Sequence, residues 1–415
     1  MASSLLVVCP HFAPSNGADG HRVRLYAAGL AERGWQLDVL ACDPRDLPIN
    51  TSPELLRSLP DVTRVHHVPS RPTVLGRLAG ASTTGRNAYR FIRAAGDQLL
   101  SKNTYRGVFF STTAFRLLPL AQRWRNRFSV PYVVDLQDPW FQTYYRDHRS
   151  VVPPGGRLRF ALANAHARRH EAAVLSRAAG VVTVSPAYQK ELRARHTGLA
   201  QTPFLTLPFG ASTAEVRVAR ETAQSFFDPQ DGRIHLAYVG RGGEDLWPAF
   251  APLFTALKAA TERRIHLHCI GTSYAPPGRE TPSLKPLAEQ LGVADRVSEY
   301  PARIDYFEAL RCLQDTHGIV LPASSDPGYN ASKVHNTVLC GPPVLGLVHE
   351  DSVAQQLWTG LAPQLELVTV GAEAASAAVQ RWLSRLPQPS TLVTDYPFEA
   401  RHQAQQLAGF LEQVI

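Results

Sequence analysis

The chain has 415 residues, 44% of them hydrophobic and 19% charged, and its formal net charge is +8. A chain of this length is too long to fold around one ordinary hydrophobic core, so we expect two or three domains. The composition excludes a disordered chain. No apolar run reaches the ~18 residues that a membrane-spanning helix needs. The early run "LLVVC" follows no basic region, so it indicates a strand and not a signal peptide, and a cytoplasmic location is expected. The five cysteines are scattered and odd in number, which favours buried thiols over a disulfide framework.

Charge is distributed unevenly between the two halves of the chain. Residues 1–200 hold 27 Lys and Arg against 13 Asp and Glu, whereas residues 201–415 hold 16 against 22. A basic first half favours a polyanionic partner or peripheral contact with an anionic membrane, at the inner face of the cell membrane. The alternative is an arginine-rich surface that is simply solvated, and charge statistics alone leave both open. Basic residues are not interleaved with aromatic ones, so no nucleic acid partner is expected.

Strands and helices alternate from the first residues onward. The apolar run "SLLVVCP" is typical of a strand buried on both faces, and the loop "HFAPSNGADG" follows it. The segment "HRVRLYAAGLAERG" repeats apolar residues at helical spacing, with Gly34 where a C-terminal cap belongs. The run "WQLDVLACDP" is the next strand. Together these segments predict a β-loop-α-β unit whose two strands are parallel.

The same alternation predicts two doubly wound α/β domains. The first series continues through "YRGVFFST", "RLLPLAQRWRNRF", "PYVVDLQDPW", a helix over Leu158–Arg177 and "AGVVTVSPAYQKELRARH". The second series runs from "RIHLAYVG" through "RIHLHCIGTS", "RVSEYP" and "HGIVLPAS" to "PPVLGLV". We expect a first domain over 1–207, a linker over 208–230, a second domain over 231–395 and a C-terminal helix over 396–415.

Ligands of doubly wound sheets bind at the carboxyl ends of the strands, so residues just after strands are the site candidates, facing a cleft between the domains. Neither G-x-G-x-x-G nor a P-loop sequence occurs. Gly17 and Gly20 precede the first helix and allow close backbone approach, although an ordinary βα turn explains them equally. Arg241 precedes two glycines and can reach a phosphate bidentately. Lys333 lies at the start of a helix, where it offers positive charge to a diphosphate or is simply solvated.

Two carboxylates, Asp135 and Asp138, end the strand "VVDLQDPW" together with Trp140. Carboxylates at this position can bind hydroxyls or move protons. For one of the two, capping a loop or pairing with an arginine is the expected alternative. No metal is predicted, because "HLHC" places His266 and His268 on the face of a strand opposite Cys269.

Six segments, taken in order, carry a resemblance to a known family. The segments are "PHFAPSNGADGHRVRLYAAGLAERGWQLDVL", "YVVDLQDPW", "VVTVSPAYQKEL", "LPFGAS", "AYVGR" and "ASKVHNTVLCGPPVLGLV". They are similar to motifs of the GT-B glycosyltransferases, in particular the bacterial family 4-like (group 1) enzymes. The terminal helix resembles the one that crosses back onto the first domain in that family.

The resemblance implies a fold of two Rossmann-like domains with the donor bound mainly by the second and the acceptor by the first. Arg241 and Lys333 would hold and stabilise the departing diphosphate, with no cofactor beyond the nucleotide-sugar co-substrate and no obligatory metal. Asp138, with Asp135 behind it, would face the transferred sugar. The remaining donor-binding residues that the resemblance implies are Gly17, Gly20, Gly240, Tyr300, Arg303, Asp326, Gly328, Tyr329 and Asn336. His21 and Trp140 would contact the acceptor.

Two departures from the family pattern concern the donor. Asn336 stands where the family usually has a Glu, and an amide offers one acceptor oxygen where a carboxylate offers two. The lysine that commonly follows Arg241 is also missing, and Asp326 is the nearest candidate for a further acidic residue that the family often has upstream.

The sequence therefore predicts a nucleotide-sugar-dependent, hexosyltransferase-like enzyme of polysaccharide biosynthesis. Its acceptor would be a glycan, a lipid-linked intermediate or a small molecule, and the resemblance implies retention of anomeric configuration. Two alternatives stay open. One is a non-catalytic relative that binds sugars or partners, and the other is a nucleotide-sugar epimerase or hydrolase.

Overall fold

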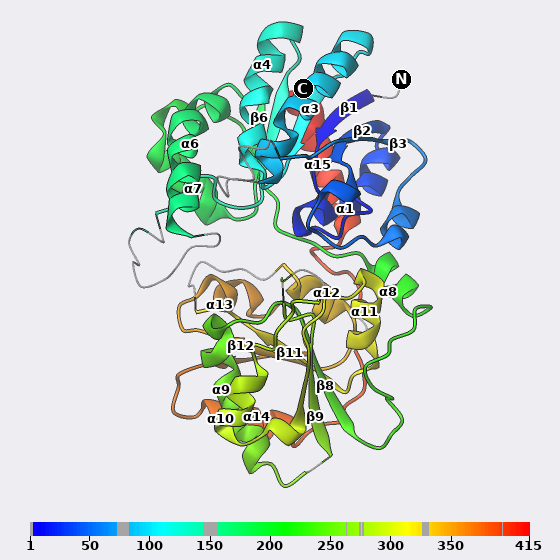
Figure 1. Ribbon diagram of the computed structural model, residues 1–415, viewed down its shortest axis with the longest axis vertical. Helices are drawn as coiled ribbons and strands as arrows, with labels where there is room; N and C mark the ends of the chain where they lie inside the picture. The colour runs from blue at the N-terminus through cyan, green and yellow to red at the C-terminus, as the bar shows by residue number, and fades with distance from the viewer. Residues whose placement is uncertain are drawn as a thin grey trace. The chain divides into compact units, whose positions relative to one another are not determined.

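A parallel β-sheet with helices on its faces forms the centre of each of two units of the chain (Figure 1). The computed structural model describes residues 3–72, 83–143, 146, 156–262, 264–273, 275, 278–325, 332–391 and 393–415. Unit 1 comprises Met1–Phe209 with Ala400–Ile415, and unit 2 comprises Gly210–Glu399.

Unit 1 contains a seven-stranded sheet of order β3-β2-β1-β4-β5-β6-β7, and its strand pairs are all parallel. Each strand of a parallel sheet is covered on both faces, so the strands are near-continuous apolar runs. All five residues of β4 and of β5 are buried. The strands are β1 (Ser3–Val8), β2 (Trp35–Cys42), β3 (Thr63–Val68), β4 (Gly107–Ser111), β5 (Tyr132–Leu136), β6 (Gly180–Thr183) and β7 (Phe204–Thr206).

Helices connect these strands and bury one side each. They are α1 (Ala18–Glu32), α3 (Thr84–Lys102), α4 (Pro119–Phe128), α6 (Arg157–Ser176), α7 (Pro186–Arg195) and α15 (Ala400–Val414). Gly34, just beyond α1, has φ +83°, a left-handed conformation that favours glycine at a helix end. The last helix, α15, packs along α1, so the two ends of the chain lie in the same unit.

Unit 2 contains a six-stranded sheet of order β10-β9-β8-β11-β12-β13, again with parallel pairs. Its strands are β8 (Ile234–Val239), β9 (Ile265–Ile270), β10 (Val297–Tyr300), β11 (Gly318–Pro322), β12 (Val344–Val348) and β13 (Leu365–Thr369). Its helices are α8 (Thr213–Ala219), α9 (Trp247–Ala259), α10 (Lys285–Leu291), α11 (Tyr306–Asp315), α12 (Val334–Leu339), α13 (Val353–Trp358) and α14 (Ala375–Leu383).

These two parallel sheets confirm the predicted α/β fold class with two doubly wound units. The segment 208–230, expected to be a linker, differs from that expectation because it contains α8, which packs against α11 of unit 2. Val216 and Ala219 of α8 are buried, and apolar contact of this kind holds a short helix in place. The sequence pattern also did not single out β3, β13, α13 or α14.

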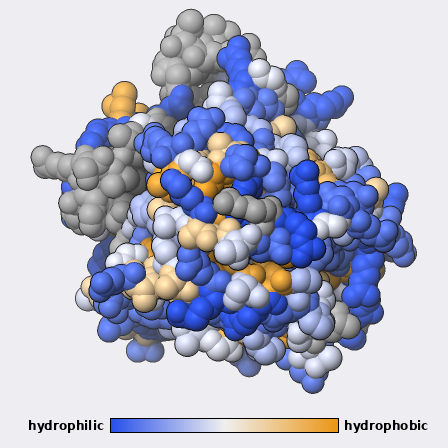
Figure 2. Space-filling model, turned by 90° about the horizontal axis from the view of Figure 1, so that it is seen from below, coloured by the Kyte–Doolittle hydropathy of each residue, from blue (hydrophilic) through white to orange (hydrophobic). Residues whose placement is uncertain are grey.

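Each unit buries a large cluster of apolar residues. Figure 2 shows a face on which hydrophilic residues predominate and hydrophobic ones occur in small groups, as water-facing surfaces usually show. Across the described residues, no helix combines the length and the apolar content that crossing a bilayer demands.

Candidate functional site

Positive charge gathers at the carboxyl end of β8 in unit 2. The ammonium nitrogen of Lys333 lies 3.0 Å from the hydroxyl oxygen of Tyr238, to which it donates, and 4.5 Å from the centre of that ring. The Tyr238 hydroxyl in turn donates to the backbone oxygen of Arg241 at 2.5 Å. Gly240 lies beside them, and a Cβ there would stand 1.9 Å from the Lys333 nitrogen. The structure thus brings together Gly240, Arg241 and Lys333, as the sequence predicts.

Two arginines influence the charge state of Lys333 in this cluster. Burial, and then the charges of Arg241 and Arg303, lower the pKa of Lys333 to about 7. The carboxylate of Asp245 binds the Arg241 guanidinium at 2.9 and 2.6 Å, in a two-point geometry. Lys333, Arg241 and Arg303 are thus close enough for their charges to interact, and the Asp245 carboxylate pairs with Arg241. An anion placed here would restore the charged form of the lysine.

The predicted donor-binding residues Tyr300 and Arg303 lie at the end of β10 and just beyond it. The carboxylate of Glu299 accepts from the backbone nitrogens of Ser283, Leu284 and Lys285 at 2.8, 3.0 and 2.6 Å. It thereby caps the first turn of α10. The Tyr300 ring packs edge-on against Phe226, with 5.0 Å between the ring centres. Arg303 donates to the backbone oxygen of Gly271 at 2.9 Å, and this contact holds its guanidinium at the carboxyl end of β9.

Asn336, on α12 three residues after Lys333, belongs to a network of polar side chains. Its side-chain nitrogen donates to the hydroxyl oxygen of Tyr306 at 3.2 Å, and that hydroxyl donates to the buried carboxylate of Glu215 at 2.9 Å. The amide oxygen of Asn336 has no hydrogen-bond partner among the described residues. A buried acceptor of this kind can take a hydrogen bond from a hydroxyl group.

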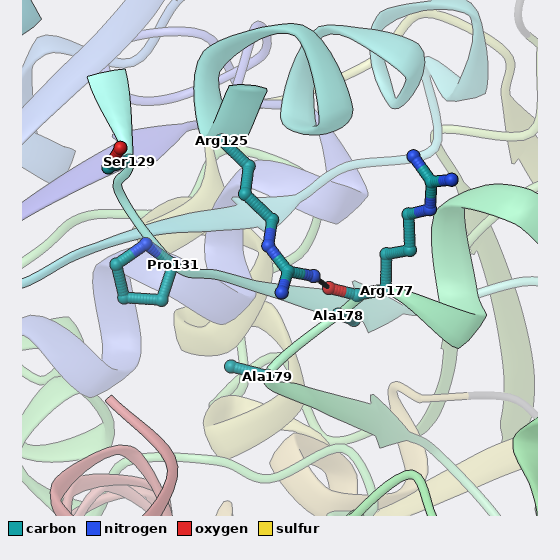
Figure 3. A pocket seen from close by; sticks show the side chains of 6 residues that line it. All are labelled: Arg125, Ser129, Pro131, Arg177, Ala178 and Ala179. Atoms are coloured by element: carbon teal, nitrogen blue, oxygen red, sulfur yellow. Dashed lines mark hydrogen bonds between the residues drawn. The ribbon is translucent and has the colours of Figure 1, made fainter. Parts of the chain in front are cut away.

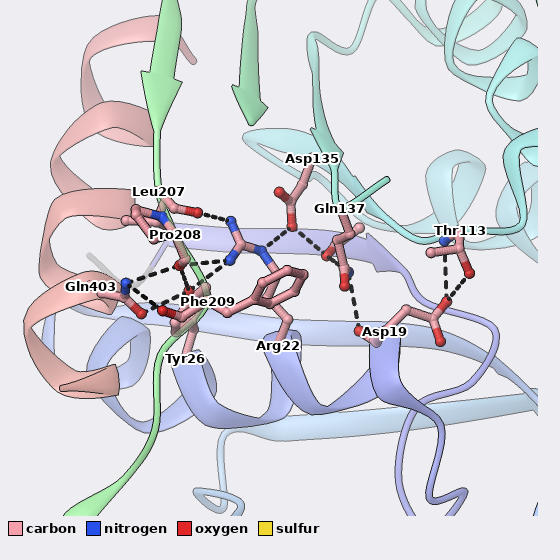
Figure 4. Close-up of polar contacts among 11 residues, drawn as sticks. Asp19, Arg22, Tyr26, Thr113, Asp135, Gln137, Leu207, Pro208, Phe209 and Gln403 are labelled. Atoms are coloured by element: carbon pink, nitrogen blue, oxygen red, sulfur yellow. Dashed lines mark hydrogen bonds and ion pairs between the residues drawn. The ribbon is translucent and has the colours of Figure 1, made fainter. Parts of the chain in front are cut away.

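In unit 1, Asp135 is a buried structural carboxylate (Figure 4). Its Oδ2 accepts from Arg22 Nε at 2.8 Å and from the Ser111 hydroxyl at 2.7 Å. Arg22 also donates to the backbone oxygens of Leu207 and Pro208, at 2.7 and 3.0 Å. This is the pairing with an arginine that the sequence left open for one of the two carboxylates. Arg22 thereby links α1 to β5 and to the segment that follows β7.

Asp138 and Trp140 follow β5 and differ in their surroundings. The Asp138 side chain is exposed at the surface. Desolvation by the surrounding protein, and then repulsion from the Asp19 carboxylate, nevertheless raise its pKa to about 6. Trp140 is 5% exposed and packs against Phe115, with 6.0 Å between the ring centres. Its contacts are those of a core residue, so contact between Trp140 and an acceptor stays a prediction. Asp138 is the carboxylate of the pair that solvent reaches.

Both predicted glycines pack against the loop before α1 so closely that a side chain would not fit. A Cβ on Gly20 would stand 2.1 Å from the backbone oxygen of His11, and one on Gly17 would stand 2.8 Å from the His11 Cβ. His11 is held by the Asp19 carboxylate, whose Oδ1 lies 2.8 Å from its Nδ1. His21 bonds the side-chain oxygen of Asn16 at 2.8 Å, and burial, then Arg24, lowers its pKa to about 3. His21 is therefore a neutral hydrogen-bonding group.

Some predictions lie outside these two clusters. Asp326, Gly328 and Tyr329 lie outside the residues that the structure describes. In the described parts of the chain, no group of three or more His, Cys, Asp or Glu side chains is arranged to hold a metal ion.

A cavity of about 360 Å³ lies at the other edge of the sheet of unit 1 (Figure 3). Two of its lining residues, Pro131 and Ala179, immediately precede β5 and β6. The cavity is therefore at the amino ends of these strands, and the candidate residues are at the carboxyl ends. It does not belong to the candidate site.

Sequence patterns did not identify Arg22, Tyr238, Asp245 or the pair formed by Tyr306 and Glu215. Asp245 could have been found from its spacing, because a carboxylate four residues after Arg241 reaches it readily. Tyr238 carried no signal, since a tyrosine in a buried strand is ordinarily a core residue.

Comparison with known proteins places these observations in a family context. Residues 17–210 match the model of the glycosyl transferase 4-like domain. Among proteins with curated descriptions, none matches this sequence.

Several solved structures resemble the chain over nearly its full length. Sucrose-phosphate synthase from Thermosynechococcus elongatus is 17% identical, with a TM-score of 0.59 over 99% of this chain and 94% of that one. HepE from Anabaena, solved in complex with UDP, is 14% identical, with a TM-score of 0.54 over 99% and 97% of the two chains. WaaG, a glycosyltransferase of lipopolysaccharide biosynthesis, is 14% identical, with a TM-score of 0.54 over 98% of both chains.

At these sequence identities the structural similarity shows the fold of the chain. The match to the family model covers most of unit 1. Residues 17–210 match a glycosyl transferase 4-like domain, and the chain as a whole has the GT-B fold.

Proposed function

We propose that the chain is a glycosyltransferase that moves a sugar from a nucleotide-sugar donor to a glycan, a lipid-linked intermediate or a small molecule. The observation that carries this proposal is the cluster of Lys333, Arg241 and Arg303 at the carboxyl end of the sheet of unit 2. Three cationic side chains gather there, so the cluster suits the negative charges of a diphosphate. The UDP complex of HepE, a structure of the same fold, supports a nucleotide as the ligand.

In the proposed reaction, the bond between the anomeric carbon and the diphosphate oxygen breaks, the oxygen of the acceptor hydroxyl bonds to that carbon, and the hydroxyl proton passes to the departing diphosphate. Negative charge grows on the departing diphosphate while the sugar becomes oxocarbenium-like. Lys333 and Arg241 stabilise that growing charge, which lowers the barrier without a metal ion in the scheme. Asp138 of unit 1, solvent-accessible and with a pKa of about 6, is the carboxyl group that the family resemblance assigns to the transferred sugar. The family resemblance favours retention of configuration, which NMR of the product anomer would determine.

The amide oxygen of Asn336 is the group that we assign to the ribose. It is buried and has no partner among the described residues, so a ribose hydroxyl can donate to it. An asparagine keeps one acceptor of the two that a carboxylate would offer. Recognition of the ribose would therefore be weaker here than with a glutamate.

The test is a calorimetric titration of the full chain with nucleoside diphosphates and with inorganic diphosphate. We expect at least one nucleoside diphosphate to bind, and Lys333→Ala to weaken binding by about 10- to 100-fold, the worth of a charge-assisted hydrogen bond. Lys258→Ala, which removes an exposed lysine of α9, is the matched control and should leave binding unchanged. Full affinity in the Lys333 variant would rule out the diphosphate role.

Asn336→Ala separates recognition of the ribose from that of the diphosphate. It should weaken the binding of a nucleoside diphosphate and leave that of inorganic diphosphate unchanged. An equal loss for both ligands would contradict the assignment of Asn336 to the ribose.

A second candidate function is binding without catalysis, and Asn336 is the observation that favours it. Donor consumption distinguishes the candidates. A transferase consumes donor in proportion to acceptor, an epimerase or hydrolase consumes it without acceptor, and a binding protein leaves it intact.

A further inference from the structure

Three neighbouring helices of unit 1 form a strongly basic surface. α3 packs against α4, and α4 packs against α6. Together they hold eleven Lys and Arg and two acidic residues, Asp97 and Glu171. Asp97 is bound by Arg123 and Arg127, at 2.9 and 2.8 Å, and Glu171 is buried. Both carboxylates are thus already engaged with basic partners or withdrawn from the surface, so the face presents positive charge to its surroundings.

The first half of α6 adds exposed apolar side chains to this charge. Leu158 is 76% exposed and Leu162 is 56% exposed, the two largest fractions among the exposed large hydrophobic residues of the described chain. They are four residues apart, so they lie on one side of the helix. The second half of α6 anchors the helix instead, because Val174 and Leu175 are fully buried in the core. Water-exposed leucines on an anchored helix indicate a surface with a partner.

The place of α6 in the sheet locates these leucines at the carboxyl edge. α6 connects β5 to β6, which are parallel neighbours, so the helix runs from the carboxyl edge of the sheet back to its amino edge. Leu158 and Leu162 are in its first two turns. They therefore belong to the same edge of unit 1 as Asp138, which follows β5.

We propose that Leu158 and Leu162, together with the exposed Arg168 and Arg169, form a docking face for the surface of an anionic lipid bilayer. In this arrangement the leucines enter the boundary between headgroups and acyl chains, and the arginines meet lipid phosphates. A soluble polyanion would satisfy the arginines but leave the leucines in water. A bilayer accommodates both. The proposal rests on the proposed function in one respect: the acceptor of the sugar is then lipid-linked and lies in that surface.

The first experiment is co-sedimentation of the full chain with vesicles of phosphatidylcholine, with and without phosphatidylglycerol. We expect binding to the anionic vesicles only. Arg168→Gln with Arg169→Gln should weaken it by about tenfold or more, at ~1 kcal/mol per basic residue near the surface. Leu158→Ser with Leu162→Ser should weaken it by at least about tenfold, because the buried apolar area is lost. Leu357→Ser, which changes a 42% exposed leucine of α13, and Arg381→Gln, on α14, are the matched controls and should bind like the unchanged chain.

The second experiment reports on the leucine position directly. All five native cysteines are buried, so a single cysteine introduced by Leu162→Cys can carry an environment-sensitive dye. Its emission should shift to the blue on addition of anionic vesicles, whereas a dye at Leu357→Cys should not respond.

Three results would overturn the proposal: binding to heparin but to neither vesicle, equal binding to neutral and anionic vesicles, or full vesicle binding by the leucine variant. Failure of the proposed function is separate from these. It would appear as absence of nucleotide binding in calorimetry, where no lipid is present.

Discussion

The Lys333 ammonium lies 3.0 Å from the Tyr238 hydroxyl and 4.5 Å from the centre of the same ring. The lysine thus contacts the neutral Tyr238 through a hydrogen bond and a cation–π contact, while the charges of Arg241 and Arg303 lower its pKa. In the ligand-free chain this arrangement disfavours the charged form of the lysine. An anionic ligand would reverse that preference, which makes Lys333 the most sensitive reporter of the candidate site.

We expect the binding of nucleoside diphosphates to weaken as pH rises above about 7. The pKa of Lys333 is lowered to about 7 in the ligand-free chain, and a bound anion favours its protonated form. Below that pKa the lysine is already charged, so its titration does not make the affinity change with pH. Above it, binding must take up a proton, and affinity falls by up to about tenfold per pH unit. Calorimetry in buffers of different ionisation enthalpy measures the uptake directly. Lys333→Arg stays protonated, so persistence of the pH dependence in that variant would show another group to be responsible.

Gly240→Ala should impair the same site without touching a charged residue. The added Cβ would stand 1.9 Å from the Lys333 nitrogen, so the ammonium must move away from Tyr238. We expect a loss of nucleotide affinity that approaches the loss in Lys333→Ala, as measured by calorimetry. Gly409→Ala on α15 is the matched control, because nothing lies within 4 Å of its Cβ position. Normal affinity in Gly240→Ala would mean that this position of the ammonium is not needed for binding.

Removal of Arg22 and Asp135 together should destabilise unit 1 by less than the sum of the two single removals. The side chains of Arg22 and Asp135 are 2% and 1% exposed, so Arg22→Met leaves a buried carboxylate unpaired, at a cost of about 3–5 kcal/mol. Arg22→Met with Asp135→Leu removes both charges and should lose clearly less than the two single variants added together. Urea unfolding measures each free energy. Arg33→Met, which breaks an exposed pair with Glu412, should leave stability nearly unchanged. Additive losses in the pair would contradict the coupling.

Acid should destabilise unit 2 through His268, which is 4% exposed. Burial first, then the charges of His266, His235 and Arg233, lowers its pKa to about 3. Below about pH 6.5 the unfolded chain gains a proton that the folded chain does not accept until about pH 3. The contribution of neutral His268 to the stability of the fold is therefore fully present above pH 6.5. It falls by about 1.4 kcal/mol per pH unit between about pH 6.5 and pH 3. His268→Gln should reduce that slope in urea unfolding followed across this range. His402→Gln, an exposed position on α15, should not, and equal slopes in all three proteins would reject the role of His268.

The sequence located the two principal cations of the candidate site correctly in space for a simple reason. Arg241 follows the strand β8, and Lys333 follows β11 and precedes α12. β8 and β11 are parallel neighbours, so whatever follows their carboxyl ends must lie close together. The pairing of Asp135 with Arg22 could not be located in this way. It depends on how α1 crosses the sheet, and several basic residues of the first half were equally available as partners.

The alternation of apolar runs and helical periodicity is local information, and by itself it determined the α/β class and the two units. The resemblance of short motifs extended this to the GT-B fold, which the solved structures confirm. Only the tertiary structure decided which carboxylate stays accessible, which glycine makes room for Lys333, and that α6 leaves Leu158 and Leu162 in water. The physical reason is that periodicity depends on neighbours along the chain. Burial and ion pairing depend instead on which segments pack against each other.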